Sequence, residues 1–447
     1  MKRQLKPARR IEGTLALLGD KSIAHRAALL SILSKGPITL KNFPNSEDCR
    51  SSLAAVEQFG VMVVKQGSEL ILTPPERPSL PENAVVYCGN SGTTARLLAG
   101  IISGCSLSAT LTGDESLSRR PMKRLVEPLG RMGAELTDHN GGLPLVIHGH
   151  TLLPFEYKMP IPSAQVKSAI LLAGMASGCS IRITEEIVSR DHTELMIGTL
   201  GGGIEVREIK PVATPDPIDP RRTKMVMPEP FKREITLSSR ATISGGEIDL
   251  PGDLSTASFL FAAAAMCKGK VSITNCGINP TRTGILEHLK AIGCKVTVED
   301  KMTVSGELRA KVTVEGGSLK SRKISGERTV ELIDEIPVVA IMAAMAEGTT
   351  VIRDASELKR KESDRLAALA ENLGRMGVKC GLLDDGIAVE GRREIHGADM
   401  LAFGDHRIAM AMSVAALAAS GPSSLDNPDV VAISCPGFYE LLGAIVH

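Results

Sequence analysis

LLGDKSIAHRAALLSILSKGPITL, residues 17–40, holds the pattern that decides the fold. The Gly-Asp pair before Lys21 is typical of a helix start, and the aliphatic run after it has enough apolar surface to be buried. Gly36 ends that run, as a glycine just past a helix does, and an apolar, β-branched stretch comes next. The segment therefore predicts a helix, a glycine stop and a strand. It also places the basic side chains of Lys21 and Arg26 where a helix is about to enter the core.

The same pattern of a helix, a glycine stop and a strand recurs along the whole chain. In each copy a run rich in Ala, Leu, Met or Ile ends at a glycine, and a short strand-like run follows most copies. These glycines are Gly36, Gly104, Gly178, Gly269, Gly348 and Gly421. Between them, segments such as LGRMGAEL (129–136) predict a second helix that also ends at a glycine before a strand. Six periods of this length are too long for a solenoid and favour six small α+β units.

Length and proline content indicate how these units are grouped. A chain of 447 residues is longer than one hydrophobic core usually organises, so more than one domain is expected. Residues 206–240 combine many prolines with mixed charges, which predicts an extended excursion between the third and fourth units. A division into three plus three units, and hence two domains, is the economical prediction.

Composition excludes several functional classes. The 52 basic and 51 acidic residues nearly balance, so no overall field attracts nucleic acid or anionic lipid, and the lack of Trp argues against base stacking. The basic N-terminus is not followed by an apolar signal segment, and no apolar run is long enough to span a membrane. The nine cysteines are scattered without a C-x-x-C pair, which favours reduced thiols over disulfides or a zinc site. We expect a soluble, cytoplasmic protein.

The predicted helix starts share an unusual feature. They are GDKS (19–22), GNSGTTAR (89–96), PSAQVK (162–167), GDLSTAS (252–258), IDEIP (333–337) and GDHR (404–407). Helix capping explains GDLSTAS, but it does not explain Lys21, Arg96 or Arg407, because cations are disfavoured at the positive end of a helix dipole. A bound anion would make these cations favourable, since helix starts bind anions. We therefore predict a site for a multiply charged anion, built from helix starts of both domains.

Further charged residues accompany these starts. In SLSRRPMKRL (116–125), Arg120 directly precedes a proline and is the preferred ligand among four cations. In ELKRKESDRLAAL (357–369), Lys361 and Arg365 are four residues apart, so a helix would place both on one face. An arginine there suits a carboxylate or phosphate.

Two other residues have competing interpretations. Asp334 is either an ordinary helix cap or a general base held near the anion site. In SRDHTELM (189–196), Arg190 is a candidate ligand, whereas a lone histidine such as His192 is more often structural, and we interpret it so. The chain lacks G-x-x-x-x-G-K-[ST], so no nucleotide-binding signature competes.

Taken in order, GDKSIAHR, GNSGTTAR, RRPM, SAQVKSA, RDHTE, NPTRTG, KESDRL and GDHRIAMA resemble the motifs of the 5-enolpyruvylshikimate-3-phosphate (EPSP) synthase family, over essentially the whole chain. SAQVK, RDHTE and NPTR resemble its class II bacterial branch. The resemblance implies an α/β fold of two domains, each of three βαβαββ units, in an inside-out, barrel-like arrangement with a cleft between them. It also implies that the N-terminal strand joins the C-terminal half. The predicted domains are thus residues 1–20 with 250–447, and residues 21–249.

The resemblance implies a reaction too: transfer of the enolpyruvyl group of phosphoenolpyruvate to the 5-hydroxyl of shikimate 3-phosphate, with release of phosphate and without a metal or cofactor. Both substrates carry a phosphate and a carboxylate, which would explain the basic helix starts. The implied ligands of shikimate 3-phosphate are Lys21, Ser22, Arg26, Ser163, Ala164, Gln165, Arg190, Asp334 and Lys361. The implied ligands of phosphoenolpyruvate are Lys21, Asn90, Gly92, Arg120, Gln165, Arg365 and Arg407.

The chemistry of this reaction points to particular residues. Protonation of the phosphoenolpyruvate methylene develops positive charge at C2, while the acceptor hydroxyl must lose a proton, so one acid and one base are needed. Glu362 and Asp334 are the candidates, with Lys21 as a third catalytic residue, and the sequence leaves open which carboxyl group moves which proton. The Lys and Arg side chains would stabilise the leaving phosphate.

The chain departs from the family pattern at several positions. Ile433 stands where several members carry a lysine, and Cys435 replaces a phenylalanine. Ala164 removes a hydroxyl that the other branch has in its phosphate site. The herbicide glyphosate typically binds the phosphoenolpyruvate subsite of the family. Gly92 favours sensitivity, whereas Leu97 in place of a proline favours tolerance, so we expect reduced but not absent inhibition.

Two alternatives remain at this point. UDP-N-acetylglucosamine enolpyruvyl transferase usually has Lys-Asn where this chain has Lys21-Ser22, and a loop cysteine as general acid. A non-catalytic phosphometabolite-binding protein would have lost an acid or base, yet Asp334 and Glu362 are present. We expect a monomer whose domains close when anions bind, because like charges would otherwise repel across the cleft.

Overall fold

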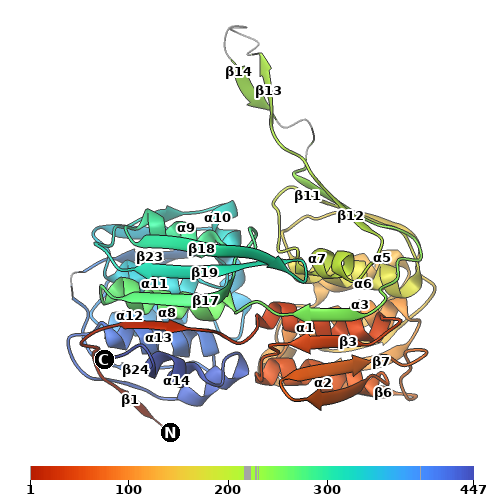
Figure 1. Cartoon of the computed structure of the whole chain (residues 1–447), viewed down its shortest axis with the longest axis horizontal. Coiled ribbons are helices and arrows are strands. Elements are labelled where there is room, and N and C mark those ends of the chain that lie inside the picture. The colour runs from red at the N-terminus through yellow and green to blue at the C-terminus, as the bar shows by residue number, and fades with distance from the viewer. Residues whose placement is uncertain (1, 216–222, 227–228, 230, 393) are drawn as a thin grey trace.

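The computed structural model describes residues 2–215, 223–226, 229, 231–392 and 394–447. Figure 1 shows two lobes of small mixed sheets and helices lying side by side. The core of the first lobe contains buried residues between Ile23 and Leu250. The core of the second lobe contains Leu5, Ile11 and Leu17 together with residues from Leu254 onward. Two separate cores agree with a two-domain fold; the residue boundaries of the domains stay a prediction.

The predicted repeat is clearest in the middle of the first lobe. Its elements are β6 (Ala84–Tyr87), α3 (Gly92–Gly104), β7 (Ser108–Thr112), α4 (Glu115–Ser118), α5 (Lys123–Met132), β8 (Glu135–His139) and β9 (Gly142–His148). Strand β6 pairs parallel with β7, and β9 lies antiparallel between β7 and β8. With the short α4 set aside, this is a βαβαββ unit.

The other two units of the first lobe have the same sheet order. One consists of β16 (Gly246–Asp249), α1 (Lys21–Leu30), η1 (Ser31–Leu33), β3 (Ile38–Lys41), α2 (Glu47–Gln58), β4 (Met62–Gln66) and β5 (Glu69–Thr73). The other consists of β10 (Phe155–Lys158), α6 (Ala164–Ser177), β11 (Ile181–Glu185), α7 (His192–Thr199), β12 (Ile204–Glu208) and β15 (Arg233–Leu237).

The second lobe contains the remaining three units. The first is β2 (Glu12–Leu15), α8 (Leu254–Met266), β17 (Lys270–Gly277), α9 (Gly284–Ala291), β18 (Lys295–Val304) and β19 (Glu307–Glu315). The next is β20 (Lys323–Ile324), α10 (Glu327–Glu331), α11 (Ile336–Ala344), β21 (Thr349–Ile352), η2 (Ser356–Arg360), α12 (Arg365–Arg375), β22 (Cys380–Leu383) and β23 (Gly386–Glu390). The last is β24 (Asp399–Met400), α13 (His406–Leu417), β25 (Ser423–Leu425), η3 (Pro428–Ile433), α14 (Phe438–Gly443) and β1 (Arg3–Leu5).

Within the described residues, the sheets are small and mixed and none closes into a barrel, in agreement with the expected α/β fold. Two other details of the predicted architecture need correction. The last unit has a three-stranded sheet, because η3 and α14 follow β25 where a hairpin would complete the pattern. The proline-rich excursion interrupts the third unit, between β12 and β15, and does not join units three and four.

The excursion includes a hairpin of its own. Strands β13 (Val212–Pro215) and β14 (Thr223–Val226) pair antiparallel, and Figure 1 shows them projecting away from the first lobe. Pro217, Pro220, Pro228 and Pro230, on which part of the prediction rested, lie outside the described residues.

The chain crosses between the lobes twice, since β2 and β16 each pair with a strand of one lobe before the chain enters the other. Strand β2 is parallel to β17, and β16 is parallel to β3. The two crossing segments are hydrogen-bonded to each other: Asp20 N donates to Pro251 O at 2.8 Å, and Asp253 N donates to Leu18 O at 3.1 Å. The N-terminal strands β1 and β2 pair with strands of the second lobe, and the crossings form a double connection between the lobes.

Close helix packing positions the helix starts in the first lobe. A Cβ added to Gly100 of α3 would lie 2.2 Å from Ala169 O of α6, and one added to Gly104 would lie 2.4 Å from Ala173 O. Real Cβ atoms do not approach backbone so closely, so glycine at both positions permits α3 and α6 to pack at short range. This packing brings the N-terminal ends of the two helices to the same place.

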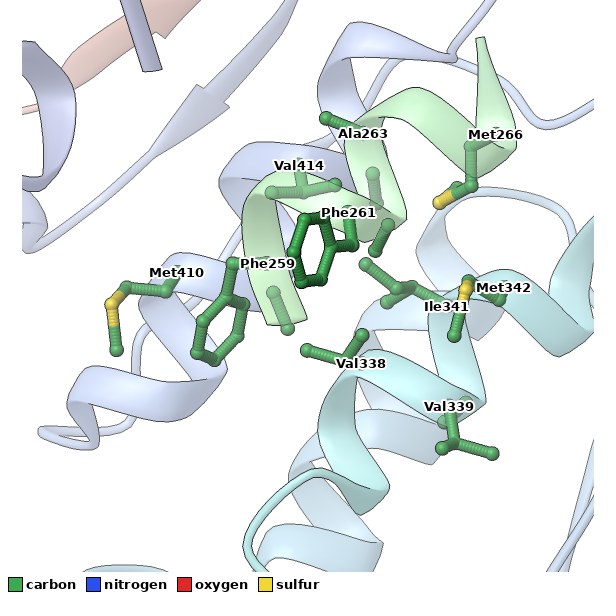
Figure 2. Packing of buried hydrophobic residues seen from close by; sticks show 14 of the residues in the cluster. Phe259, Phe261, Ala263, Met266, Val338, Val339, Ile341, Met342, Met410 and Val414 are labelled. Carbon is green, nitrogen blue, oxygen red and sulfur yellow. The ribbon is translucent and has the colours of Figure 1, made fainter. Parts of the chain in front are cut away.

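The core of the second lobe is built from helices that are apolar on every side. Helix α8 is buried along its whole length. In Figure 2, Phe259 and Phe261 of α8 lie among Val338 and Ile341 of α11 and Val414 of α13. Because such helices are stable only in a core, their starts are held in fixed positions. Among the described helices, none has the length and apolarity to cross a membrane.

Candidate active site

The six predicted helix starts all precede helices, namely α1, α3, α6, α8, α11 and α13. Five of these helices have a side-chain cap, from Asp20, Ser91, Ser163, Asp253 and Asp405. Helix α11 begins after Glu335 without such a cap. Many of the predicted site residues lie at or next to these starts, and they come from both lobes. The others, at or before the starts of α5, α7 and α12, are Arg120, Arg190, Lys361, Glu362 and Arg365.

In the first lobe, hydrogen bonds bring the predicted phosphoenolpyruvate ligands together. Arg120 Nη2 donates to Asn90 Oδ1 at 2.7 Å, and Arg96 Nη1 donates to Gln165 Oε1 at 2.8 Å. A Cβ added to Gly92 would lie 2.8 Å from Arg96 Nη1 and 3.3 Å from Arg120 Nη1. The start of α3 therefore faces two guanidinium groups at close range.

In the second lobe, the buried Asp405 organises a second cluster. It accepts a hydrogen bond from Arg365 Nε at 2.8 Å, while Arg365 Nη2 donates to Glu362 Oε2 at 2.6 Å. Arg407 Nη1 donates to the backbone oxygen of Asp334 at 2.9 Å. The structure thus places Asp334, Glu362, Arg365 and Arg407 around one point, although KESDRL, GDHR and IDEIP are far apart in the sequence.

The two clusters face each other across the lobes with opposite charges in contact. Arg190 Nη2 lies 2.7 Å from Asp334 Oδ2, and Arg120 Nη1 lies 3.4 Å from Glu362 Oε1. The expected repulsion between like charges is therefore wrong for this structure, because a carboxylate of the second lobe stands opposite each of these arginines.

Asp334 and Glu362 are both held in the ionised state. Burial would raise the pKa of Asp334, but Arg190 and Arg407 hold that pKa well below its ordinary value. Burial would likewise raise the pKa of Glu362, but Arg365 and Arg120 hold it well below the usual range. The low pKa values keep both carboxyl groups deprotonated with their arginines in place, although the reaction needs one of them as an acid. An anion that takes over these arginines would raise both pKa values.

Lys21 has a carboxylate partner that sequence reasoning missed. Lys21 Nζ lies 2.8 Å from Oδ2 of the buried Asp48, in the first turn of α2. Burial opposes the charge of Lys21, but Asp48 outweighs it and raises the pKa of the lysine. Lys21 therefore remains a cation at neutral pH. No local signal marks Asp48, since an acidic residue in a first helical turn is common.

The predicted shikimate 3-phosphate ligands of the first lobe line the starts of α1 and α6. Arg26 is buried, donating from Nε to Thr193 Oγ1 at 2.9 Å and from Nη2 to Ser168 Oγ at 3.2 Å. Ser22 lies in the first turn of α1. Ser163 caps α6, and Ala164 and Gln165 are its first two residues.

Lys361 is placed differently from the prediction. It follows the short helix η2, while α12 begins at Arg365, so Lys361 and Arg365 do not share one helix face. Lys361 Nζ instead lies 2.9 Å from Glu357 Oε1, and Arg124 of the first lobe lies 3.4 Å from the same oxygen. Asp364 caps α12, which explains the break: a capping residue starts a new helix.

His406, within GDHR, is a further residue at this site, and no signal in the sequence distinguished it. It is the first residue of α13 and is fully buried, and burial holds its pKa well below the ordinary value. Neither ring nitrogen has a hydrogen-bond partner among the described residues. Ile433, in place of the expected lysine, ends η3, and η3 packs against α2 of the other lobe.

Comparison with known proteins places this arrangement in a family. The sequence model of EPSP synthase (3-phosphoshikimate 1-carboxyvinyltransferase) matches residues 5–442. The chain is 41% identical over 439 residues to the 3-phosphoshikimate 1-carboxyvinyltransferase of Anaeromyxobacter sp. (strain K), covering 97% of this chain and 94% of that protein. It is 43% identical over 440 residues to that of Anaeromyxobacter sp. (strain Fw109-5), covering 97% and 96% of the two chains.

Solved structures agree with the sequence relatives. The structure resembles EPSP synthase from Acinetobacter baumannii with a TM-score of 0.80 at 34% sequence identity, covering 100% of this chain and 98% of that one. These matches favour neither UDP-N-acetylglucosamine enolpyruvyl transferase nor a non-catalytic phosphometabolite-binding protein. The two-lobed chain, with paired arginines and carboxylates where its lobes meet, belongs to the EPSP synthase family.

Proposed function

We propose that the residues between the lobes transfer the enolpyruvyl group of phosphoenolpyruvate to the 5-hydroxyl of shikimate 3-phosphate. The reaction is an addition, which gives a tetrahedral intermediate, followed by elimination of phosphate, and it is a step of the shikimate pathway. One observation carries the proposal: two ionised carboxylates, Asp334 and Glu362, each lie between arginines of both lobes. Substrates that carry two anionic groups each can replace these carboxylates as partners of the arginines.

The phosphoenolpyruvate subsite lies where Arg120, Arg365 and Glu362 meet. Arg120 reaches Glu362 from the first lobe, and Arg365 reaches it from the second. A phosphate or carboxylate bound there would receive forked hydrogen bonds from both lobes, which arginine provides and lysine does not. Lys21, Asn90, Gly92, Gln165 and Arg407 complete the proposed subsite.

The shikimate 3-phosphate subsite lies at the starts of α1 and α6 and around Asp334. Ser163, Ala164, Gln165 and Arg190 would hold the 3-phosphate, because the free N–H groups of a helix start bind phosphate. Ser22 and Arg26 would hold the carboxylate, and Asp334 and Lys361 would contact the 5-hydroxyl.

Proton transfer follows from the electrostatics of the two carboxylates. When the substrates engage Arg190 and Arg407, Asp334 loses counter-charge and its pKa rises toward the range of a useful base. Glu362 loses Arg120 and Arg365 in the same way, which favours its protonated form. The developing charge on the leaving phosphate would be stabilised by Lys21, which Asp48 keeps protonated.

The test of this function is phosphate release from phosphoenolpyruvate with different acceptors. We expect release that depends on shikimate 3-phosphate and no release with UDP-N-acetylglucosamine. Release only with the nucleotide sugar would assign the other enolpyruvyl transfer. Binding of both anions without any release would identify a non-catalytic binding protein.

Thiol chemistry separates the same alternatives. Each of the nine cysteines is a free thiol, but burial raises the pKa of Cys49 and of Cys435 to about 12. Since the thiolate is the reactive form, we expect iodoacetamide at pH 7 to leave phosphate release unchanged. Rapid inactivation that bound phosphoenolpyruvate prevents would show instead that a cysteine acts in the cleft, as in the nucleotide-sugar enzyme.

Glyphosate is expected to compete with phosphoenolpyruvate, with weaker inhibition than in sensitive family members. Gly92→Ala is expected to raise tolerance further and to weaken phosphoenolpyruvate binding less, because its methyl group would press on Arg96 and Arg120. Inhibition constants for the parent and the variant check this. Gly130→Ala is the control, since nothing lies within 4 Å of a Cβ there. A Gly92→Ala variant as sensitive as the parent would contradict the expected crowding.

We further propose that the enzyme acts as a monomer in the cytoplasm. Light scattering at working concentration and cell fractionation check the two parts. A dimer mass at enzyme concentrations that support full turnover would overturn the first.

A further inference from the structure

Two motifs that the substrate subsites leave largely unused, RDHTE and NPTRTG, meet behind the cleft. His192 Nδ1 of the first lobe lies 2.6 Å from Glu307 Oε1 of the second lobe. Asn279 of the second lobe donates from Nδ2 to Asp191 Oδ1 at 2.8 Å and to Glu307 Oε2 at 3.1 Å. We call these four residues, Asp191, His192, Asn279 and Glu307, the interlobe anchor.

Three of the four anchor residues are deeply buried, while the side chain of Asp191 is 16% exposed. His192, Glu307 and Asn279 are 1%, 2% and 4% exposed. By contrast, Lys232 and Glu327 also pair across the lobes, but their side chains are 39% and 53% exposed. Exposed ion pairs contribute little, whereas loss of one partner from a buried polar cluster leaves the other without compensation. The anchor therefore holds the two lobes in a defined relative position, which the exposed Lys232–Glu327 pair does not.

Asp191 shows that the anchor fixes the start of α7 relative to the second lobe. It occupies the N-cap position of α7, yet its side chain makes no capping hydrogen bond. Its carboxylate instead accepts from Asn279 and, at 3.0 Å, from Arg233 Nη1. An aspartate at this position ordinarily caps its own helix. Here the start of α7 is tied to the other lobe.

The surroundings place the anchor at the connection between the lobes. A small cavity beside it is lined by Asp20, His192, Pro251, Asn279, Arg282 and Glu307, so it adjoins both crossing segments. Arg282 Nη1 pairs with Asp20 Oδ2 at 3.2 Å. Figure 1 shows β18 and β19 reaching from the second lobe toward α7, and a Cβ on Gly306 in their turn would lie 2.3 Å from Thr199 Oγ1. Relative motion of two lobes is smallest at their covalent connection, so the anchor can persist when the cleft opens.

Arg190 directly precedes the anchored residues, and its guanidinium group reaches Asp334. We propose that the interlobe anchor positions Arg190 for shikimate 3-phosphate, so that Asp191, His192, Asn279 and Glu307 are positioning residues of the binding site. This inference rests on the proposed role of Arg190 as a ligand of that substrate. The anchor acts through Arg190 and does not touch the substrate itself.

The test compares Asn279→Ala, His192→Phe and Arg190→Gln by calorimetric titration with shikimate 3-phosphate and by steady-state kinetics. We expect Asn279→Ala and His192→Phe each to raise the Kd for shikimate 3-phosphate about 10-fold, the scale of one lost buried hydrogen bond, with the KM for phosphoenolpyruvate nearly unchanged. His192→Asn, whose Nδ2 stands where His192 Nδ1 meets Glu307, should recover most of the affinity. Lys232→Gln, the exposed interlobe control, should bind like the parent.

A double-mutant cycle decides between positioning and mere stabilisation. If the anchor acts through Arg190, Arg190→Gln combined with Asn279→Ala binds shikimate 3-phosphate no worse than Arg190→Gln alone. Additive losses, equal weakening of both substrates, or a lower Tm with unchanged affinities would each overturn the inference. If His192→Phe does not fold, the binding test rests on Asn279→Ala alone. Failure of Arg190→Gln itself to weaken binding would instead overturn the proposed ligand role, and wild-type phosphate release tests the overall function separately.

Discussion

Asp334→Asn is expected to lower kcat by about 100-fold or more, the scale of a positioned general base. The amide keeps the shape of the carboxyl group and can still accept a hydrogen bond from Arg190, which lies 2.7 Å from Asp334 Oδ2. It cannot take the proton of the acceptor hydroxyl. Binding of the anionic substrates should be preserved or tighter, because the variant removes a negative charge that competes with them for Arg190 and Arg407.

The measurement is kcat together with the Kd of shikimate 3-phosphate for the same protein. Asp385→Asn is the matched control, since it also removes a carboxylate paired with an arginine, Arg353, but on a more exposed pair. The control should keep the kcat of the parent. Near-normal turnover in Asp334→Asn would reduce Asp334 to a residue that flanks α11.

Arg407→Lys is expected to raise the KM for phosphoenolpyruvate by about 10- to 100-fold, as loss of a hydrogen bond to a charged group does. The positive charge remains, but a point donor replaces a planar fork. Arg407 Nη1 already donates to the backbone oxygen of Asp334 at 2.9 Å. Because the guanidinium group is planar, this hydrogen bond fixes the directions of its other N–H donors. A lysine cannot hold that contact and a substrate oxygen in the same geometry.

Affinity for shikimate 3-phosphate, measured by titration without the second substrate, should change little in Arg407→Lys. Arg375→Lys, which alters a half-exposed arginine paired with Glu371, is the control and should leave both constants unchanged. Equal weakening of both substrates in Arg407→Lys would mean that Arg407 belongs to a different subsite from the one proposed.

Much of the fold was predictable because its signals are local. Capping residues mark five of the six predicted starts, and Pro337 near the first turn marks α11, so all six were found from local signals. The strand exchange that ties β2 to β17 and β16 to β3 depends on pairing between distant segments, and no local pattern encodes it. The position of the excursion inside the third unit was misjudged for the same reason, since β15 returns to its sheet only after the proline-rich stretch.

In the candidate site too, contacts between residues far apart in the sequence could not be predicted from local patterns. Cations at helix starts stand out in the sequence because they oppose the helix dipole, and this identified Lys21, Arg96 and Arg407. Their partners do not stand out: Asp48 beside Lys21 has an ordinary sequence context. The pairing of Arg190 with Asp334 joins residues of different lobes, and it reverses the expected repulsion across the cleft. The pairing of each cation with its carboxylate is therefore seen only in the three-dimensional structure.

The most direct test of the central claim is ³¹P NMR of phosphoenolpyruvate and shikimate 3-phosphate incubated with catalytic amounts of the wild-type protein. The account predicts that the phosphoenolpyruvate resonance is replaced by an equal amount of inorganic phosphate. The shikimate 3-phosphate resonance should shift in equal amount to that of an enolpyruvyl ether that keeps its 3-phosphate. Asp334→Asn should show neither change on the same timescale. Inorganic phosphate that appears while shikimate 3-phosphate remains unaltered, or that comes from its 3-phosphate, would contradict the claim.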